Sequence, residues 1–89
     1  MAAAGSVDIV NERGLHARAS ARFVKLAASF DADVRVTKDD QTVDAQSIMG
    51  LMMLAASLGS DIGVEADGPD QDAAMTAMLA LIEAKFGEE

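Results

Sequence analysis

The residues best placed to do chemistry lie in one short stretch that contains the only histidine of the chain. The stretch reads Gly14-Leu15-His16-Ala17-Arg18-Ala19-Ser20, so His16 stands between a glycine turn and the start of a predicted helix. A neutral imidazole is available as a nucleophile at cellular pH, and the first turn of a helix exposes N–H groups that bind phosphate. This combination favours phosphoryl transfer, with His16 as the residue that carries the group.

Positive charge is concentrated around this histidine. No acidic residue lies between Glu12 and Asp31. Four of the seven basic residues fall close to it in the sequence, namely Arg13, Arg18, Arg22 and Lys25. We interpret this cationic island as a surface for an acidic partner, which would accelerate encounter by electrostatic steering. The alternative is that these basic residues only form an ordinary solvated helix face, which is the commoner reason for a row of basic residues on a helix.

Composition excludes several other kinds of active site. The chain has no cysteine and a single histidine, so it cannot assemble a cysteine protease or a histidine-rich metal site. A histidine that accepts a group and passes it on needs no second catalytic residue, and we expect neither a metal nor a cofactor. The plainer alternative is that His16 only caps the helix or lies exposed.

A second motif makes the first one more specific. Ser47-Ile48-Met49-Gly50-Leu51-Met52-Met53-Leu54 follows Gly14-Leu15-His16-Ala17-Arg18 further along the chain. In this order the two motifs resemble the histidine-containing phosphocarrier family, HPr, and the resemblance covers nearly the whole chain. One position departs from the family pattern: Ala19 stands where the family usually has proline, which is similar to the nitrogen-related branch. The sequence therefore does not assign the chain to the sugar-uptake branch or to the nitrogen-related branch.

The resemblance implies a role for the matching residues. His16 would accept a phosphoryl group on a ring nitrogen, Nδ1 in the family, from phosphorylated enzyme I, and would pass it to an EIIA-type protein. Arg18 would assist at this site, and Ser47 resembles the regulatory serine that an HPr kinase/phosphorylase modifies. The alternatives are a non-covalent regulatory or ligand-binding α+β module and a purely structural interaction domain.

The expected docking surface surrounds both motifs. Short side chains beside His16 leave it accessible, and the methionines after Ser47 are surplus to the core stripe of their helix. Surplus apolar surface indicates a partner site, and methionine repacks easily against different surfaces. We assign partner binding to Ala17, Ala19, Arg22, Lys25, Ile48, Met49 and Met52. Alternatively, the apolar members fill the core, and for Met53 this alternative has equal weight.

Length and charge limit the kinds of protein to which this chain can belong. We expect the 89 residues to form one HPr-like domain over 1–89, with residues 1–5 frayed. The net charge of −8 argues against nucleic acid, which requires a broad basic surface. The longest apolar stretch, at 48–56, is far shorter than the ~18 residues of a membrane span, and no signal-peptide pattern opens the chain. We expect a cytoplasmic monomer that works with partners.

Hydrophobic periodicity predicts the order strand, helix, strand, strand, helix, strand, helix. The strands are expected at 6–10, Asp33–Lys38, Gln41–Asp44 and Asp61–Asp67, and the helices at 17–30, at 47–58 and after Gly68-Pro69. In the second helix the core stripe is expected to be Leu51, Leu54, Ala55 and Leu58. The predicted fold class is α+β, an open-faced β-sandwich whose four-stranded, mostly antiparallel sheet is covered on one face by three helices.

Overall fold

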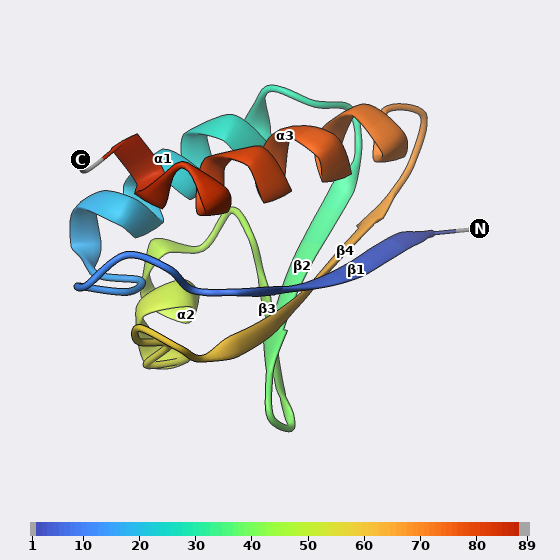
Figure 1. Ribbon diagram of the computed structural model, residues 1–89. Helices are drawn as coiled ribbons and strands as arrows, with labels where there is room; N and C mark the ends of the chain where they lie inside the picture. Colours follow the sequence, from blue (N-terminus) through green and yellow to red (C-terminus); the bar gives the residue numbers. More distant parts are fainter. Residues whose placement is uncertain (1, 88–89) are drawn as a thin grey trace.

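The protein forms a four-stranded antiparallel sheet with its helices packed on one face (Figure 1). The computed structural model describes residues 2–87. In chain order the elements are β1 (Ala3–Asp8), α1 (Ala17–Ala28), β2 (Asp33–Lys38), β3 (Gln41–Asp44), α2 (Ile48–Met53), β4 (Asp61–Asp67), α3 (Gln71–Glu83) and a 3₁₀ turn, η1 (Lys85–Gly87). The strand order is β1-β4-β2-β3, with every neighbouring pair antiparallel. The predicted open-faced sandwich is confirmed.

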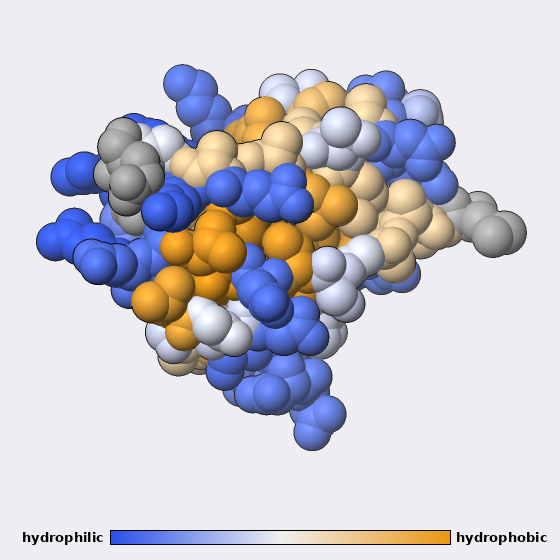
Figure 2. Space-filling view, viewed as in Figure 1, coloured by the Kyte–Doolittle hydropathy of each residue, from blue (hydrophilic) through white to orange (hydrophobic). Residues whose placement is uncertain are grey.

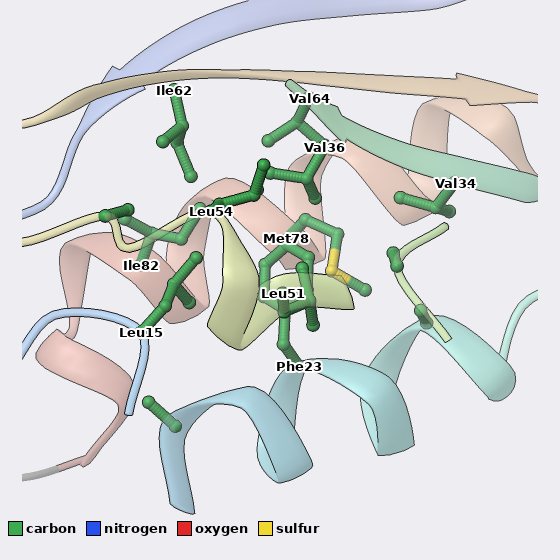
Figure 3. Packing of buried hydrophobic residues seen from close by; sticks show 14 of the residues in the cluster. Leu15, Phe23, Val34, Val36, Leu51, Leu54, Ile62, Val64, Met78 and Ile82 are labelled. Carbon is green, nitrogen blue, oxygen red and sulfur yellow. The ribbon is translucent and has the colours of Figure 1, made fainter. Parts of the chain in front are cut away.

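Alternation along the strands sends one set of side chains into the core. Ile62 and Val64 of β4 are buried, and Val36 of β2 lies directly opposite Val64 in the register. Figure 3 shows these side chains pointing toward Phe23 of α1 and Met78 of α3, which are fully buried. Burial of this apolar surface is the main stabilising term of the fold, and it holds α1 against the sheet.

β1 begins and ends earlier than predicted. The sequence indicated a strand at 6–10 after frayed residues 1–5, whereas Ala3–Asp8 form the strand and pair with residues 61–66 of β4. Alanine and glycine have weak strand propensity, but the backbone groups at the edge of β4 supply their hydrogen-bond partners. The expected fraying is therefore wrong where this strand forms, and Met1 lies outside the described residues.

α2 is much shorter than predicted. Periodicity indicated a helix over 47–58, but the helix ends at Met53 and Ala55 has a φ of +55°. Beyond this point the carbonyl oxygen of Ala56 accepts a hydrogen bond of 3.0 Å from the Leu15 N–H, which fixes the chain outside the helical path. Ala55 and Leu58, which were predicted to face the core, are therefore exposed. The other two predicted core positions, Leu51 and Leu54, are buried.

The two long helices, α1 and α3, also end at other positions than hydrophobic periodicity indicates. α1 stops at Ala28, two positions before the predicted end at Phe30. After α3, Lys85 and Phe86 both have positive φ, so the chain bends sharply. The bend turns Phe86 into the core, where its ring makes an edge contact with Phe23 at a centroid distance of 6.3 Å.

The opposite face of the sheet is bare and polar. Arg35 of β2 donates two hydrogen bonds to Oε1 of Glu65 on β4, from Nε at 3.0 Å and from Nη2 at 2.8 Å. These hydrogen bonds and the carboxylate charge raise the pKa of the Arg35 guanidinium. Arg35 alternates with the buried Val34 and Val36, so its charge lies on the face away from the helices.

No helix formed by the described residues, 2–87, has the length and apolar character needed to cross a membrane.

Candidate functional site

A closely bonded loop positions the histidine at the start of α1. Nδ2 of Asn11 donates to the carbonyl oxygen of Gly14 at 2.9 Å, and the N–H of Leu15 donates to the carbonyl oxygen of Ala56 at 3.0 Å. Gly14 has a φ of +63°, and a Cβ atom there would collide with the backbone at Ala56, so the turn requires glycine. The buried Leu15 side chain then anchors the residue directly before His16.

His16 is the N-cap of α1, in the place that the sequence predicts. Its backbone is extended, and its carbonyl oxygen accepts the first helical hydrogen bond from the Ser20 N–H at 2.8 Å. Its Nδ1 accepts a hydrogen bond of 3.3 Å from the Arg18 N–H. In a neutral imidazole an accepting Nδ1 places the proton on Nε2. The Nδ1 lone pair therefore faces the first-turn N–H groups, where negative charge is stabilised.

The cationic island extends further in space than in the sequence. Four cations line one pocket of about 510 Å³, which Glu12 also lines; they are Arg13, Arg18, Arg22 and Lys85. Lys85 is the member that sequence reasoning missed, because it reaches this place only through the positive-φ bend at η1. Lys25 is exposed in the last turn of α1. The pocket gives the start of α1 a positive potential within an acidic protein.

Arg18 and Arg22 have different surroundings. Both are exposed, but Nη1 of Arg22 donates a hydrogen bond to the carbonyl oxygen of Phe86. Arg22 therefore ties α1 to η1 as well as supplying positive charge. This structural role depends on a contact between distant parts of the chain, which periodicity does not show.

Ala17 and Ala19 were both assigned to partner binding, and the structure separates them. Ala17 is exposed beside His16. Ala19 is fully buried, on the same helix face as Phe23 four positions later. The assignment of the Ala19 side chain to a docking surface is therefore wrong. Its backbone N–H still belongs to the first turn of α1, where N–H groups have no intrahelical acceptor.

α2 exposes a second, apolar part of the surface, which we call the α2 patch. Its members with their exposed fractions are Ile48 (40%), Met49 (70%), Met52 (41%), Met53 (73%) and Leu58 (57%). Met53 is thus not a core residue, and Leu58 was missed because the predicted helix was too long. In Figure 2 apolar side chains reach the lower left of the view, where α2 and the loop after it lie in Figure 1.

Ser47 caps α2, as predicted. Its Oγ accepts a hydrogen bond of 3.0 Å from the N–H of Gly50, and its side chain is half-buried beside Ile48. A Cβ atom on Gly50 would lie 3.0 Å from this Oγ and 3.1 Å from Cβ of Val43. Glycine at position 50 therefore lets Ser47 and Val43 pack closely against the backbone of α2, where a Cβ atom would crowd both side chains.

The histidine and the α2 patch belong to neighbouring parts of the structure. α1 packs against α2, and the hydrogen bond between Leu15 and Ala56 joins the start of α1 to the chain after α2. Among residues 2–87 no group of three or more histidine, aspartate or glutamate side chains could hold a metal ion. An imidazole nitrogen beside an N–H group of the first helical turn is an arrangement that can act as a nucleophile toward phosphorus.

Comparison with known proteins gives matches over nearly the whole chain. The family model described as PTS HPr component phosphorylation site matches residues 4–84. The phosphocarrier protein HPr of Neisseria meningitidis serogroup A is 52% identical over 83 residues, which cover 93% of each chain. The phosphocarrier protein NPr of Shewanella violacea is 42% identical over 82 residues, covering 92% of this chain and 90% of the relative.

A solved structure shows the same arrangement of helices and strands. The crystal structure of HPr-C-His from Thermoanaerobacter tengcongensis superposes with a TM-score of 0.93 and 44% sequence identity. The superposition covers 98% of this chain and 98% of that chain. Sequence and structure therefore point to the same group of proteins.

Proposed function

Because the chain belongs to the HPr family of phosphocarrier proteins of the phosphotransferase system, we propose that His16 carries the phosphoryl group. The position of Nδ1 supports this proposal most directly. It belongs to the only histidine, and it faces the N–H of Arg18 at the start of α1. A phosphate bonded to this nitrogen would lie where the helix offers hydrogen-bond donors.

Transfer requires in-line attack of Nδ1 on the phosphorus of the donor. The Nδ1 lone pair forms the new N–P bond, and the electron pair of the breaking N–P bond returns to the imidazole nitrogen of the donor. As the bond forms, Nδ1 ceases to be an acceptor, so the Arg18 N–H becomes available to a phosphate oxygen. Ala19 contributes a second N–H in the same turn, which the usual proline would lack.

A carrier must stabilise the phosphate without trapping it. Transfer between two histidine nitrogens is nearly balanced when both sites stabilise phosphate to a similar degree. His16 is half-buried and Arg18 is exposed, so the phosphate would remain accessible to the next protein. First-turn N–H groups and one guanidinium provide moderate, charge-assisted stabilisation. This is the strength that a reversible carrier needs.

The partners of an HPr protein are other proteins of the phosphotransferase system. For this chain we assign phosphorylated enzyme I, charged by phosphoenolpyruvate, as the donor and EIIA-type proteins as acceptors, all meeting it as a cytoplasmic monomer. The docking surface combines Ala17, Arg22 and Lys25 with the α2 patch, from which Ala19 is excluded by its burial. Cations around His16 suit an acidic partner surface, and the apolar patch supplies desolvated contact area.

Incubation with phosphoenolpyruvate and a catalytic amount of bacterial enzyme I tests the proposal. Intact mass spectrometry should show the gain of one phosphate that is stable in alkali and lost in acid. A non-covalent regulatory or ligand-binding module would gain none. Because relatives include both HPr and NPr proteins, rates of onward transfer to sugar-specific and nitrogen-related EIIA proteins assign the branch.

Arg18→Ala should slow phosphoryl transfer from enzyme I on the order of tenfold to a hundredfold, because one charge-assisted contact to the transferring phosphate is lost. The fold should be unaffected, since this side chain is exposed. Rapid-quench measurement of the transfer rate gives the result. Arg35→Ala removes the same charge from the open face of the sheet and should have little effect. Equal, small losses in the two variants would show that Arg18 is only a solvated charge.

Met49→Asp should weaken binding to enzyme I about tenfold or more, because it places a charge in the apolar part of the docking surface. At 70% exposure Met49 contributes little to the core, so the melting temperature should change little. Calorimetric titration and a thermal melt measure the two quantities. Gln41→Asp adds the same charge at the hairpin turn, away from α2 (Figure 1), and should bind normally. Unchanged affinity of Met49→Asp would place the docking surface elsewhere.

We further assign regulation to Ser47, by a kinase of the HPr kinase/phosphorylase type. Two observations support this assignment. The segment Ser47-Ile48-Met49-Gly50-Leu51-Met52-Met53-Leu54 resembles the family motif around its regulatory serine. The hydroxyl lies at the N-cap of α2, next to the exposed Ile48, and the Ser47 side chain is only half-buried.

A further inference from the structure

Three methionines lie together on the exposed side of α2. Met49, Met52 and Met53 are spaced at i, i+3 and i+4, so their side chains are neighbours on one helix face. Their exposed fractions are 70%, 41% and 73%. Met75 and Met78 of α3 provide an internal contrast, because only 8% and 0% of them are exposed. Within residues 2–87, which the structure describes, the thioether groups thus divide into an accessible cluster and a protected pair.

We propose that these three methionines form an oxidation-sensitive modification site, whose oxidant is hydrogen peroxide and whose oxidation weakens docking. The proposal rests on the proposed function, in which the α2 patch contacts enzyme I. The chain has no cysteine, so methionine thioethers are its only peroxide-reactive sulfur atoms. Three of them are concentrated in the part of the surface proposed to meet the partner.

The modification transfers one oxygen atom to each sulfur. The O–O bond of hydrogen peroxide breaks and a sulfur–oxygen bond forms, so the sulfur loses two electrons and the remaining peroxide oxygen leaves as water. A methionine sulfoxide reductase with a dithiol reverses the change: the sulfoxide oxygen leaves as water and the dithiol becomes a disulfide. The three methionines can therefore be oxidised and reduced repeatedly while the polypeptide stays intact.

Oxidation should affect binding much more than folding. Leu51 and Leu54 hold α2 in the core, and neither carries a reactive atom. The sulfoxide oxygens of Met49, Met52 and Met53 remain in water while the protein is free. When the patch is covered by an apolar partner surface, these polar oxygens lose water without gaining a donor, which is unfavourable.

Residue-resolved oxidation kinetics test the first half of the proposal. The folded protein is treated with hydrogen peroxide, quenched at intervals and analysed by peptide mass spectrometry. Met49 and Met53 should be oxidised about tenfold faster than Met75 and Met78, with Met52 in between, as their exposure dictates. Oxidation of all five at one rate would overturn the selectivity.

Binding measurements test the second half. Protein oxidised only at the α2 methionines should keep its thermal melt and bind enzyme I about tenfold more weakly, and reductase with dithiothreitol should restore the affinity. The triple variant M49L/M52L/M53L should show the same affinity before and after peroxide, whatever its starting value. Met75→Leu should remain peroxide-sensitive. Unchanged affinity of the fully oxidised patch would overturn the proposal.

The proposed function and this inference can fail separately. Untreated protein is assayed first for phosphate gain from enzyme I, and a protein that gains none contradicts the carrier role of His16. Calorimetric binding of enzyme I before and after peroxide then decides the effect of oxidation at the α2 methionines independently of phosphate chemistry.

Discussion

His16→Ala should give a folded protein that accepts no phosphate from enzyme I. The variant lacks the only imidazole of the chain, and with it the Nδ1 atom that faces the N–H of Arg18. Its folding should be only slightly impaired, because loss of an N-cap acceptor typically costs about 1 kcal/mol. The neighbouring anchors of this loop, the buried Leu15 side chain and the Gly14 turn, remain in place.

His16→Asn separates capping from chemistry. Asparagine is among the best N-cap residues, so this variant should be as stable as the original protein or slightly more stable. It lacks an imidazole nucleophile and should therefore accept no phosphate. Thermal melts and intact mass spectrometry after incubation with enzyme I and phosphoenolpyruvate measure both properties. Phosphate gain by either variant at the original rate would mean that the carrier residue is not His16.

The strands of the hairpin and of the sheet centre could be predicted to the residue from the sequence. Asp33–Lys38 and Asp61–Asp67 alternate polar and apolar side chains, and Gln41–Asp44 returns from the Asp39-Asp40 turn with Val43 as its one apolar side chain. Such a signal is local, because a strand with one buried face must repeat every two residues. The start of α1 directly after His16 could also be predicted, since a glycine turn followed by helical spacing marks it.

The extent of α2 could not be predicted in this way. Its apolar spacing continues to Leu58, but the helix ends at Met53, and in the segment after it the carbonyl oxygen of Ala56 accepts a hydrogen bond from the N–H of Leu15. That hydrogen bond joins residues far apart in the sequence, so hydrophobic periodicity, which is a local signal, cannot predict it. The same applies to Lys85, which reaches the cationic pocket only through the backbone bend at η1.

Ala19 shows a different kind of error. Its spacing from Phe23 already placed it on the apolar face of α1, and the structure confirms that both are fully buried. Its proximity to His16 in the sequence nevertheless suggested that it contacts partners. Adjacent residues on a helix point in different directions, so helical spacing was the better guide to its exposure.

Ser47→Asp should keep the stability of the protein and lower phosphoryl transfer to His16 about tenfold or more. Aspartate is a good N-cap residue, and its carboxylate can accept the hydrogen bond that Oγ now accepts from the Gly50 N–H. A negative charge at the start of α2 also interacts favourably with the helix dipole. The melting temperature should therefore stay within a few degrees of the original value.

Docking should be weakened for two reasons. The new charge lies beside the exposed Ile48 and Met49, where an apolar partner surface would have to desolvate it. In the proposed complex it would also repel the acidic partner groups that we expect to face Arg18 and Arg22. A phosphate on Ser47 would add about −1.5 to −2 charges at the same place, so its effect should be at least as large.

Three comparisons separate charge from capping in this result. Ser47→Ala removes the cap without adding charge, so it should lose about 1 kcal/mol of stability and transfer phosphate almost normally. Gln41→Asp adds the charge at the distant hairpin turn and should also transfer normally. Raised salt should restore part of the rate in Ser47→Asp, because screening weakens repulsion between exposed charges. If Ser47→Asp transfers phosphate as fast as the original protein, Ser47 acts only as the cap of α2, since its charge then has no influence on docking.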